Sequence, residues 1–156
     1  MIRKLALFVV LALTSSMAYA ACTVSASGIA FGTYPPFSTT PTNATGTVTV
    51  SCSGLLGLLI SYTIALNAGV NSGGSFSNRR INSGSSYLSY QLYTNATYSQ
   101  VWGDGTGGTS TVSGICLITL LGIPCTSTNT IYGQIPALQA PSPGAYTDTI
   151  TVTVTY

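Results

Sequence analysis

AYTDTITVTVTY, residues 145–156, is the stretch that decides the fold class. From Thr149 onward, apolar side chains and threonines alternate strictly. A period of two built from strand-forming residues predicts a β-strand with one buried face. No turn or partner strand follows in the sequence, so we expect this face to pack in its own sheet or to border a missing strand. The face carries Ile150, Val152, Val154 and Tyr156.

The remaining strands are expected to be short and separated by turns. Alternation predicts strands at residues 22–26, 45–52, 60–66, 87–93 and 128–136, with weaker ones at 28–32 and 96–102. Loops at 38–44 and 69–84 and turns at 103–105 and 141–144 are rich in Gly, Pro, Ser and Asn. The side chains expected to point inward are Val48, Val50, Cys52, Leu88, Tyr90 and Leu92. With no helical period after residue 20, the pattern predicts an all-β sandwich.

The first twenty residues are typical of a secretory signal peptide. Arg3 and Lys4 precede an apolar run over residues 5–13, and Ala18-Tyr19-Ala20 fits an A-x-A cleavage site. The run is too short to span a membrane. We therefore expect a signal peptide over residues 1–20 and an exported domain over residues 21–156. Lipid attachment at Cys22 is the weaker alternative, because a lipoprotein signal favours leucine where this chain has tyrosine.

The exported domain is almost free of charge. Its ionised side chains are Arg79, Arg80, Asp104 and Asp148, which cancel; the formal charge of +2 comes from the signal peptide. The absence of a basic patch makes nucleic acid a poor partner. The chain has no histidine, so a serine nucleophile would lack its usual base, and two aspartates distant in sequence are a poor catalytic pair. We expect no enzyme, no catalytic residue, no metal site and no cofactor.

Export permits disulfide bonds between the four cysteines. Four cysteines allow three pairings. We favour Cys22–Cys52, which would pin the start of the domain to a later strand, and Cys116–Cys125, which would close a short loop. The sequence contains no C-x-x-C spacing, so the cysteines do not indicate a metal site.

Six segments, taken in order, resemble the spore coat protein U domain, the pilin module of the archaic, Csu-type chaperone–usher pili. These segments are CTV (22–24), VTVSC (48–52), YQLY (90–93), VWGDG (101–105), YGQIP (132–136) and GAYTDTI (144–150). They extend over nearly the whole of residues 21–156.

The resemblance implies an incomplete immunoglobulin-like β-sandwich that lacks its final strand. In the family, a periplasmic chaperone fills the gap first, and the N-terminal extension of the next pilin then replaces it. The subunit is passed through an outer-membrane usher. Backbone hydrogen bonds and alternating side chains would supply the affinity. On this basis, the strand carrying Ile150, Val152, Val154 and Tyr156 would face the chaperone or the donor strand.

The segment before the first family cysteine departs from the polymerising members. Only Ala21 stands between the expected cleavage site and Cys22, whereas a donor strand needs roughly five residues or more. We therefore expect a tip or terminating subunit, which accepts a strand and donates none, displayed on the cell surface and acting in adhesion and biofilm formation.

Two apolar segments, residues 54–60 and 115–125, do not alternate. They are either core elements, the favoured interpretation, or loops that expose leucine and isoleucine to a host or abiotic surface. The residues of these candidate adhesive loops are Leu55, Leu56, Leu58, Leu59, Leu117, Ile118, Leu120 and Leu121.

Other residues suggest binding less strongly. Tyrosines together with Trp102 could stack on a sugar, but aromatic residues in strands usually pack. Arg79 and Arg80 are expected to be a solvated loop pair, Asp104 a turn residue and Asp148 a surface residue. The alternative to a pilin is a self-complete secreted module that binds carbohydrate or a spore or cell surface.

Overall fold

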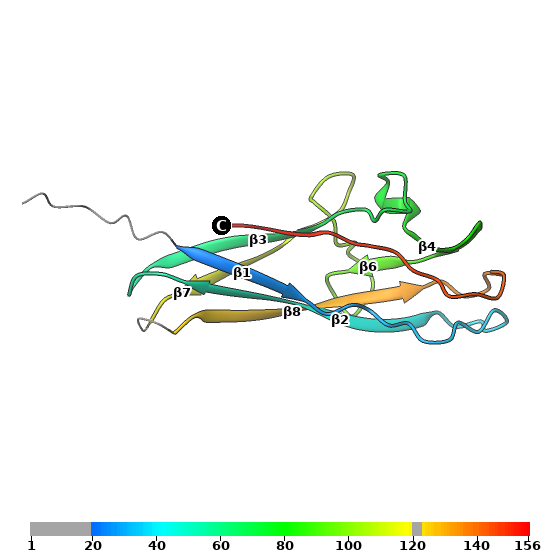
Figure 1. Ribbon diagram of the computed structural model, residues 1–156, viewed down its shortest axis with the longest axis horizontal. Helices are drawn as coiled ribbons and strands as arrows, with labels where there is room; N and C mark the ends of the chain where they lie inside the picture. Colours follow the sequence, from blue (N-terminus) through cyan, green and yellow to red (C-terminus); the bar gives the residue numbers. More distant parts are fainter. Residues whose placement is uncertain (1–19, 120–122) are drawn as a thin grey trace, which may run out of the picture.

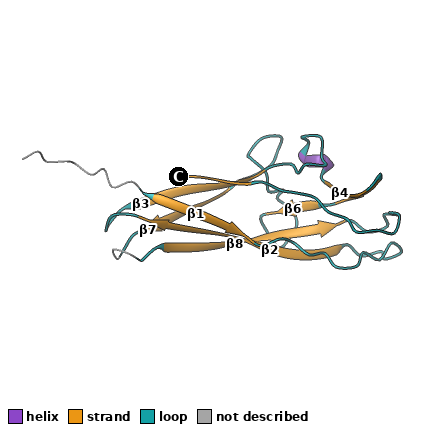
Figure 2. Cartoon of the chain, viewed as in Figure 1, coloured by secondary structure: helices purple, strands orange, loops and turns teal. Residues whose placement is uncertain are grey.

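The computed structural model describes residues 20–119 and 123–156, which form a β-sandwich (Figures 1 and 2). The predicted signal peptide up to residue 19, together with Leu120 and Leu121, lies outside these residues. The described part contains no α-helix, and none of its segments is a helix able to cross a membrane.

Two antiparallel sheets form the layers. The first has the order β1–β2–β8–β6, with β1 (Ala21–Ala26), β2 (Thr42–Ser53), β8 (Cys125–Ile135) and β6 (Gln91–Tyr93). The second has the order β7–β3–β9, with β7 (Val112–Leu117), β3 (Leu59–Leu66) and β9 (Val152–Thr155). A separate hairpin joins β4 (Arg80–Ser83) to β5 (Ser86–Ser89), after the short 3₁₀ turn η1 (Phe76–Asn78).

The core lies between the sheets and is built by alternation along the strands. Tyr62, Ile64 and Leu66 of β3 face the side chains predicted to point inward, all of which are buried: Val48, Val50, Cys52, Leu88, Tyr90 and Leu92. The indole of Trp102 is fully buried, and its Nε1 donates to the carbonyl oxygen of Ile64 at 3.1 Å. This hydrogen bond satisfies the one polar atom of the largest core side chain.

Several predicted strand boundaries were wrong. The strand expected over 87–93 is divided at Tyr90, because β5 pairs with β4 whereas β6 pairs with β8. β4 and the first three residues of β2 lie in stretches predicted to be loops. Residues 28–32 form no ladder, and the 96–102 region contributes only isolated bridges. These errors share a cause, since strand pairing with distant partners overrides local composition.

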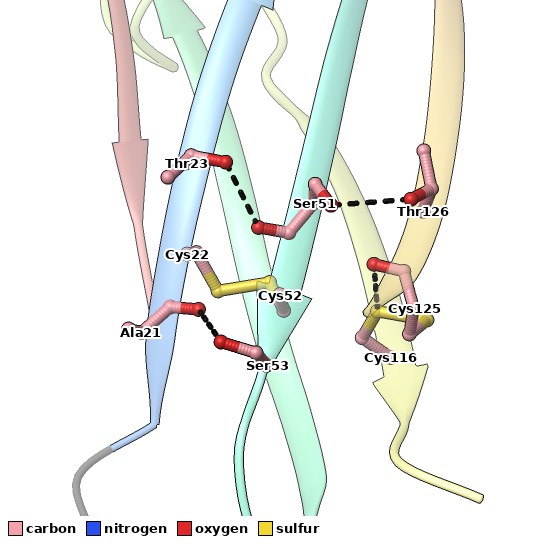
Figure 3. The surroundings of a disulfide bond; sticks show 9 residues. All are labelled: Ala21, Cys22, Thr23, Ser51, Cys52, Ser53, Cys116, Cys125 and Thr126. Carbon is pink, nitrogen blue, oxygen red and sulfur yellow. Dashed lines mark hydrogen bonds between the residues drawn. A yellow bond between two sulfur atoms is a disulfide. The ribbon is translucent and has the colours of Figure 1, made fainter. Parts of the chain in front are cut away.

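Both predicted disulfides are present (Figure 3). Cys22 and Cys52 are direct cross-strand partners, so this bond ties β1 to β2. Cys116 and Cys125 join the end of β7 to the start of β8 and therefore link the two sheets.

Candidate functional site: an open groove between two strand edges

One side of the sandwich is open between β1 and β9. In the described chain, β1 pairs only with β2 and β9 only with β3, so each is the edge of its sheet. Figure 1 shows the C-terminal strand running beside β1. A groove of about 1000 Å³ continues from this open side, with walls from residues 26–36 and from residues 141–152. β1 contributes only Ala26 to the groove lining, and β9 only Val152. The floor of the groove consists of core side chains, among them Leu88, Leu92, Ile131 and Ile135.

The wall that begins with β1 exposes side chains that point inward. Val24 lies opposite Val50, and both lie on the face that carries the Cys22–Cys52 bond. Val50 is completely buried, yet Val24 is 44% exposed. An inward-facing valine open to solvent indicates that a covering element is missing at this edge.

The same wall continues across two glycines of the sheet. Ile29 packs over Gly46 of β2 and Phe31 over Gly133 of β8, where an added Cβ would lie 2.8 Å from either side chain. Phe31 also meets Tyr90 edge to face, with ring centroids 6.1 Å apart. The glycines therefore let residues 28–34 lie close against the sheet and form the groove wall.

The opposite wall is the stretch predicted to border a missing strand. Ile150, Val152 and Val154 pack against the core but remain half-buried, while the threonines between them face outward. Tyr156 is exposed, so it adds little to the covered face.

Backbone groups along both walls are directed into the groove. The carbonyl oxygens of Thr149 and Thr151 accept hydrogen bonds from Val70 and Asn67 on the β3 side. Because alternate residues of a strand direct their backbone groups to opposite sides, those of Ile150 and Val152 face the groove. On β1 the amide of Ser27 donates to β2, which leaves the backbone of Ala26 facing the groove by the same alternation.

A polar cluster holds the C-terminal wall in place. The hydroxyl of Tyr90 donates to Asp148 Oδ2 at 2.7 Å, and Asn71 donates to Oδ1 through its backbone N at 3.2 Å and through Nδ2 at 3.0 Å. Burial, followed by the hydrogen bond to Asp148, raises the pKa of Tyr90. Asp148 is therefore a half-buried groove residue, and its prediction as a surface residue was wrong.

Arg79 lies behind this cluster and is only 1% exposed, so its prediction as a solvated loop residue was also wrong. Its guanidinium donates to Gln91 Oε1 at 2.8 Å and to the carbonyl oxygen of Asn67 at 2.7 Å. Burial lowers the pKa of Arg79 to about 10, against the opposing effects of Tyr90 and Asp148. The sequence signal for this position was slight, since an arginine in a Gly/Ser-rich stretch normally stays in solvent.

A second feature is an apolar end of the sandwich, which we call the apolar tip. It combines the β2–β3 connection with the described residues at the end of β7 and at the start of β8, which lie at the same end of the molecule in Figure 1. The two parts are joined by hydrogen bonds from Gly57 N to Ile118 O at 2.8 Å and from Ile118 N to Leu58 O at 2.9 Å. The exposed side chains of the tip are Leu55, Leu56, Leu59, Ile115, Leu117 and Ile123.

The predicted adhesive loops are therefore exposed only in part. Ile118 is buried and Leu58 packs against the core, so these two are core residues rather than surface ones. Leu55, Leu56, Leu59 and Leu117 are exposed.

The remaining candidates have structural roles. Trp102 is buried and cannot stack on a sugar. Asp104 accepts hydrogen bonds from the hydroxyl and the backbone amide of Thr106, as expected of a turn residue, and these bonds lower the pKa of its carboxyl.

The fold and the six sequence segments both agree with a known protein family. The model of the Spore Coat Protein U domain matches residues 7–153. The chain belongs to the spore coat protein U domain family. No curated protein sequence matches it.

Among solved structures, this spore coat protein U domain resembles a chain in the crystal structure of the CsuC-CsuE chaperone-tip adhesion subunit pre-assembly complex from archaic chaperone-usher Csu pili of Acinetobacter baumannii. The TM-score is 0.58 at 24% identity, which establishes a likeness of fold. The match covers 88% of this chain but 40% of the other, so the domain corresponds to less than half of that chain.

Proposed function

We propose that this chain is a non-catalytic structural subunit of a chaperone–usher pilus, completed by a β-strand from another polypeptide. The observation that carries the proposal is the groove, where inward-facing apolar side chains remain accessible between two edges with free backbone groups. Strand addition satisfies both features, because the added backbone bonds to the edges and its alternate side chains enter the groove. Family membership and the fold of the Csu complex support this function.

The order of partners follows from the need to cover the groove at every stage. An open apolar groove between two strand edges invites non-specific pairing, so a periplasmic chaperone would occupy it until a neighbouring pilin replaces it at the outer-membrane usher. The finished subunit would then stand in a surface pilus. The near-absence of charge in the exported domain suits tight association between subunits.

Two neighbouring substitutions test the groove directly. Val152→Lys places a charge on the inward face of β9, whereas Thr153→Lys places the same charge on its outward face. We expect the first variant to lose the one-to-one complex with a synthetic donor strand or with the chaperone, measured by native mass spectrometry, and the second to keep it. Equal binding by both variants would exclude the groove as the site of strand addition.

The apolar tip supports a more specific role at the adhesive end of a fibre. Its exposed side chains lie on two parts that are hydrogen-bonded to each other, and Leu59 and Leu117 are direct cross-strand partners. Exposed apolar clusters mark interaction sites, and burying them against an apolar surface would contribute about 25 cal/mol per Å² before association costs. We assign to this tip the attachment to host or abiotic surfaces that leads to biofilm formation.

The test of the tip replaces Leu55, Leu56 and Leu59 with serine. We expect an unchanged melting temperature but reduced attachment to polystyrene. Val70→Ser is the matched control, since Val70 is 66% exposed and lies beyond the far end of β3. Attachment that is insensitive to the leucines would refute the adhesive role.

A further inference from the structure

The inward-facing side chains of the C-terminal groove wall include one charged group. Asp148, Ile150 and Val152 share the inward face of this stretch because strand side chains repeat every two residues. Among the described residues that line the groove, Asp148 is the one that carries a charge. Ile150 follows it along the row and Tyr146 precedes it, and the floor beneath combines leucine and isoleucine side chains with Tyr90.

The carboxylate is fixed in position. Tyr90 holds Oδ2, and Asn71 holds Oδ1 through two donors. Gly69 leaves the space that the carboxylate occupies, since a Cβ there would collide with Oδ2. A carboxylate offers about four acceptor positions, so these three bonds leave about one position free on a residue that lines the groove.

The nearest buried cation does not neutralise this carboxylate through direct hydrogen bonds. Asp148 acts electrostatically on Arg79, but the two terminal guanidinium nitrogens donate to Gln91 and to the backbone of Asn67. Because the half-buried carboxylate lines the open groove, solvent has access to it while the groove is unfilled.

A strand that fills the groove excludes this solvent. If an apolar side chain covered Asp148, the charge would lose solvation without compensation, which is costly in a low-dielectric site. A side chain with a hydrogen-bond donor in the same place would take over the role of the solvent.

We propose that the strand filling the groove carries a hydrogen-bond-donating side chain, such as Asn, Gln, Ser or Lys, opposite Asp148 and apolar side chains at its other inward positions. The inference rests on the proposed function, because it specifies the chemistry of the strand that the groove accepts. Asp148 thereby sets the register: a slip of two residues would place an apolar side chain on the carboxylate. In this role Asp148 is a specificity-determining residue of the groove.

A peptide series tests the inference. The host is a synthetic strand that alternates valine and threonine, and a single asparagine is moved through each inward valine position in turn. Affinity for the protein of residues 21–156 is measured by titration. We expect one asparagine position to bind about tenfold tighter than the all-valine host, the factor that satisfying a buried charged acceptor provides.

The variant Asp148→Val provides the second arm of the test. We expect it to lose the preference for asparagine and to bind the all-valine host best. Asp148→Asn, which keeps the shape and an acceptor oxygen, guards against a folding defect in the valine variant and should retain a reduced preference. Tightest binding of the all-valine peptide to the unmodified protein would overturn this inference alone, whereas no binding by any peptide would overturn the proposed function as well.

Discussion

Removal of the Cys22–Cys52 bond should destabilise the protein more than removal of Cys116–Cys125. It should also lower the affinity of the groove for a donor strand. The first bond closes a loop with a sequence separation of 30 and the second one of 9. The chain-entropy relation for these loops gives stabilisations of about 3.6 and about 2.6 kcal/mol. In one variant Cys22 and Cys52 are both replaced by alanine, and in the other Cys116 and Cys125 are.

The two bonds also differ in what they hold. Cys22 lies in β1, whose one sheet neighbour in the described chain is β2, and the Cys22–Cys52 bond ties this groove wall to the sheet. None of the four cysteines lines the groove, but Cys22 lies on the strand that leads directly into the wall of residues 26–36, whereas Cys116–Cys125 links the sheets through β7 and β8. We therefore expect loss of the first bond to weaken strand binding and loss of the second to leave the affinity unchanged.

Urea denaturation of both variants measures the loss of stability. Hydrogen exchange of the β1 amides and the affinity for a donor peptide measure the effect on the groove wall. The reasoning would be refuted if the Cys116–Cys125 deletion were the more destabilising, or if β1 exchanged at the same rate with and without its disulfide.

Three further perturbations follow from the contacts. Gly133→Ala should displace the Phe31 ring from the groove wall and lower donor-strand affinity, as titration would show; unchanged affinity would mean that the ring moves at no cost. Arg79→Ala should cost about 3 kcal/mol in urea denaturation, because the carbonyl oxygen of Asn67 loses its side-chain donor and Gln91 Oε1 loses one of its two donors. A cost below about 1 kcal/mol would contradict the burial argument. The pKa of Asp104 in the folded state lies below its ordinary value, so its hydrogen bonds stabilise the protein at pH values above the ordinary pKa, and this stability is lost as the pH falls through the lowered pKa. Asp104→Asn should therefore make the free energy of unfolding depend less on pH in this acidic range. Identical pH profiles of the variant and the unmodified protein would count against the hydrogen bonds.

Local patterns in the sequence predicted the elements whose environment is set by alternation. The inward row on β2 and the apolar face from Ile150 to Val154 follow from a period of two combined with strand-forming residues. These features depend on near neighbours in the chain, which a sequence shows directly.

The features that the sequence did not reveal depend on partners far apart in the chain. Asp148 enters the groove because Tyr90 and Asn71 meet it across 58 and 77 residues, and Arg79 is buried because Gln91 and Asn67 receive its donors. Whether Ile118 is core or surface depended on its backbone bond to Leu58. Composition alone assigns charged residues such as Arg79 and Asp148 to the surface, since it contains no information on distant partners.

Thermal unfolding of the protein of residues 21–156, alone and with a donor strand, tests most directly whether the sandwich is completed by another chain. Strand binding to the native state alone should stabilise it by about 2.7 kcal/mol at a hundredfold excess over Kd, or roughly 5–10 °C in Tm for a domain of this size. We predict this rise together with a one-to-one complex. A high Tm that neither a donor strand nor the chaperone changes would show a self-complete sandwich and would contradict assembly by strand addition.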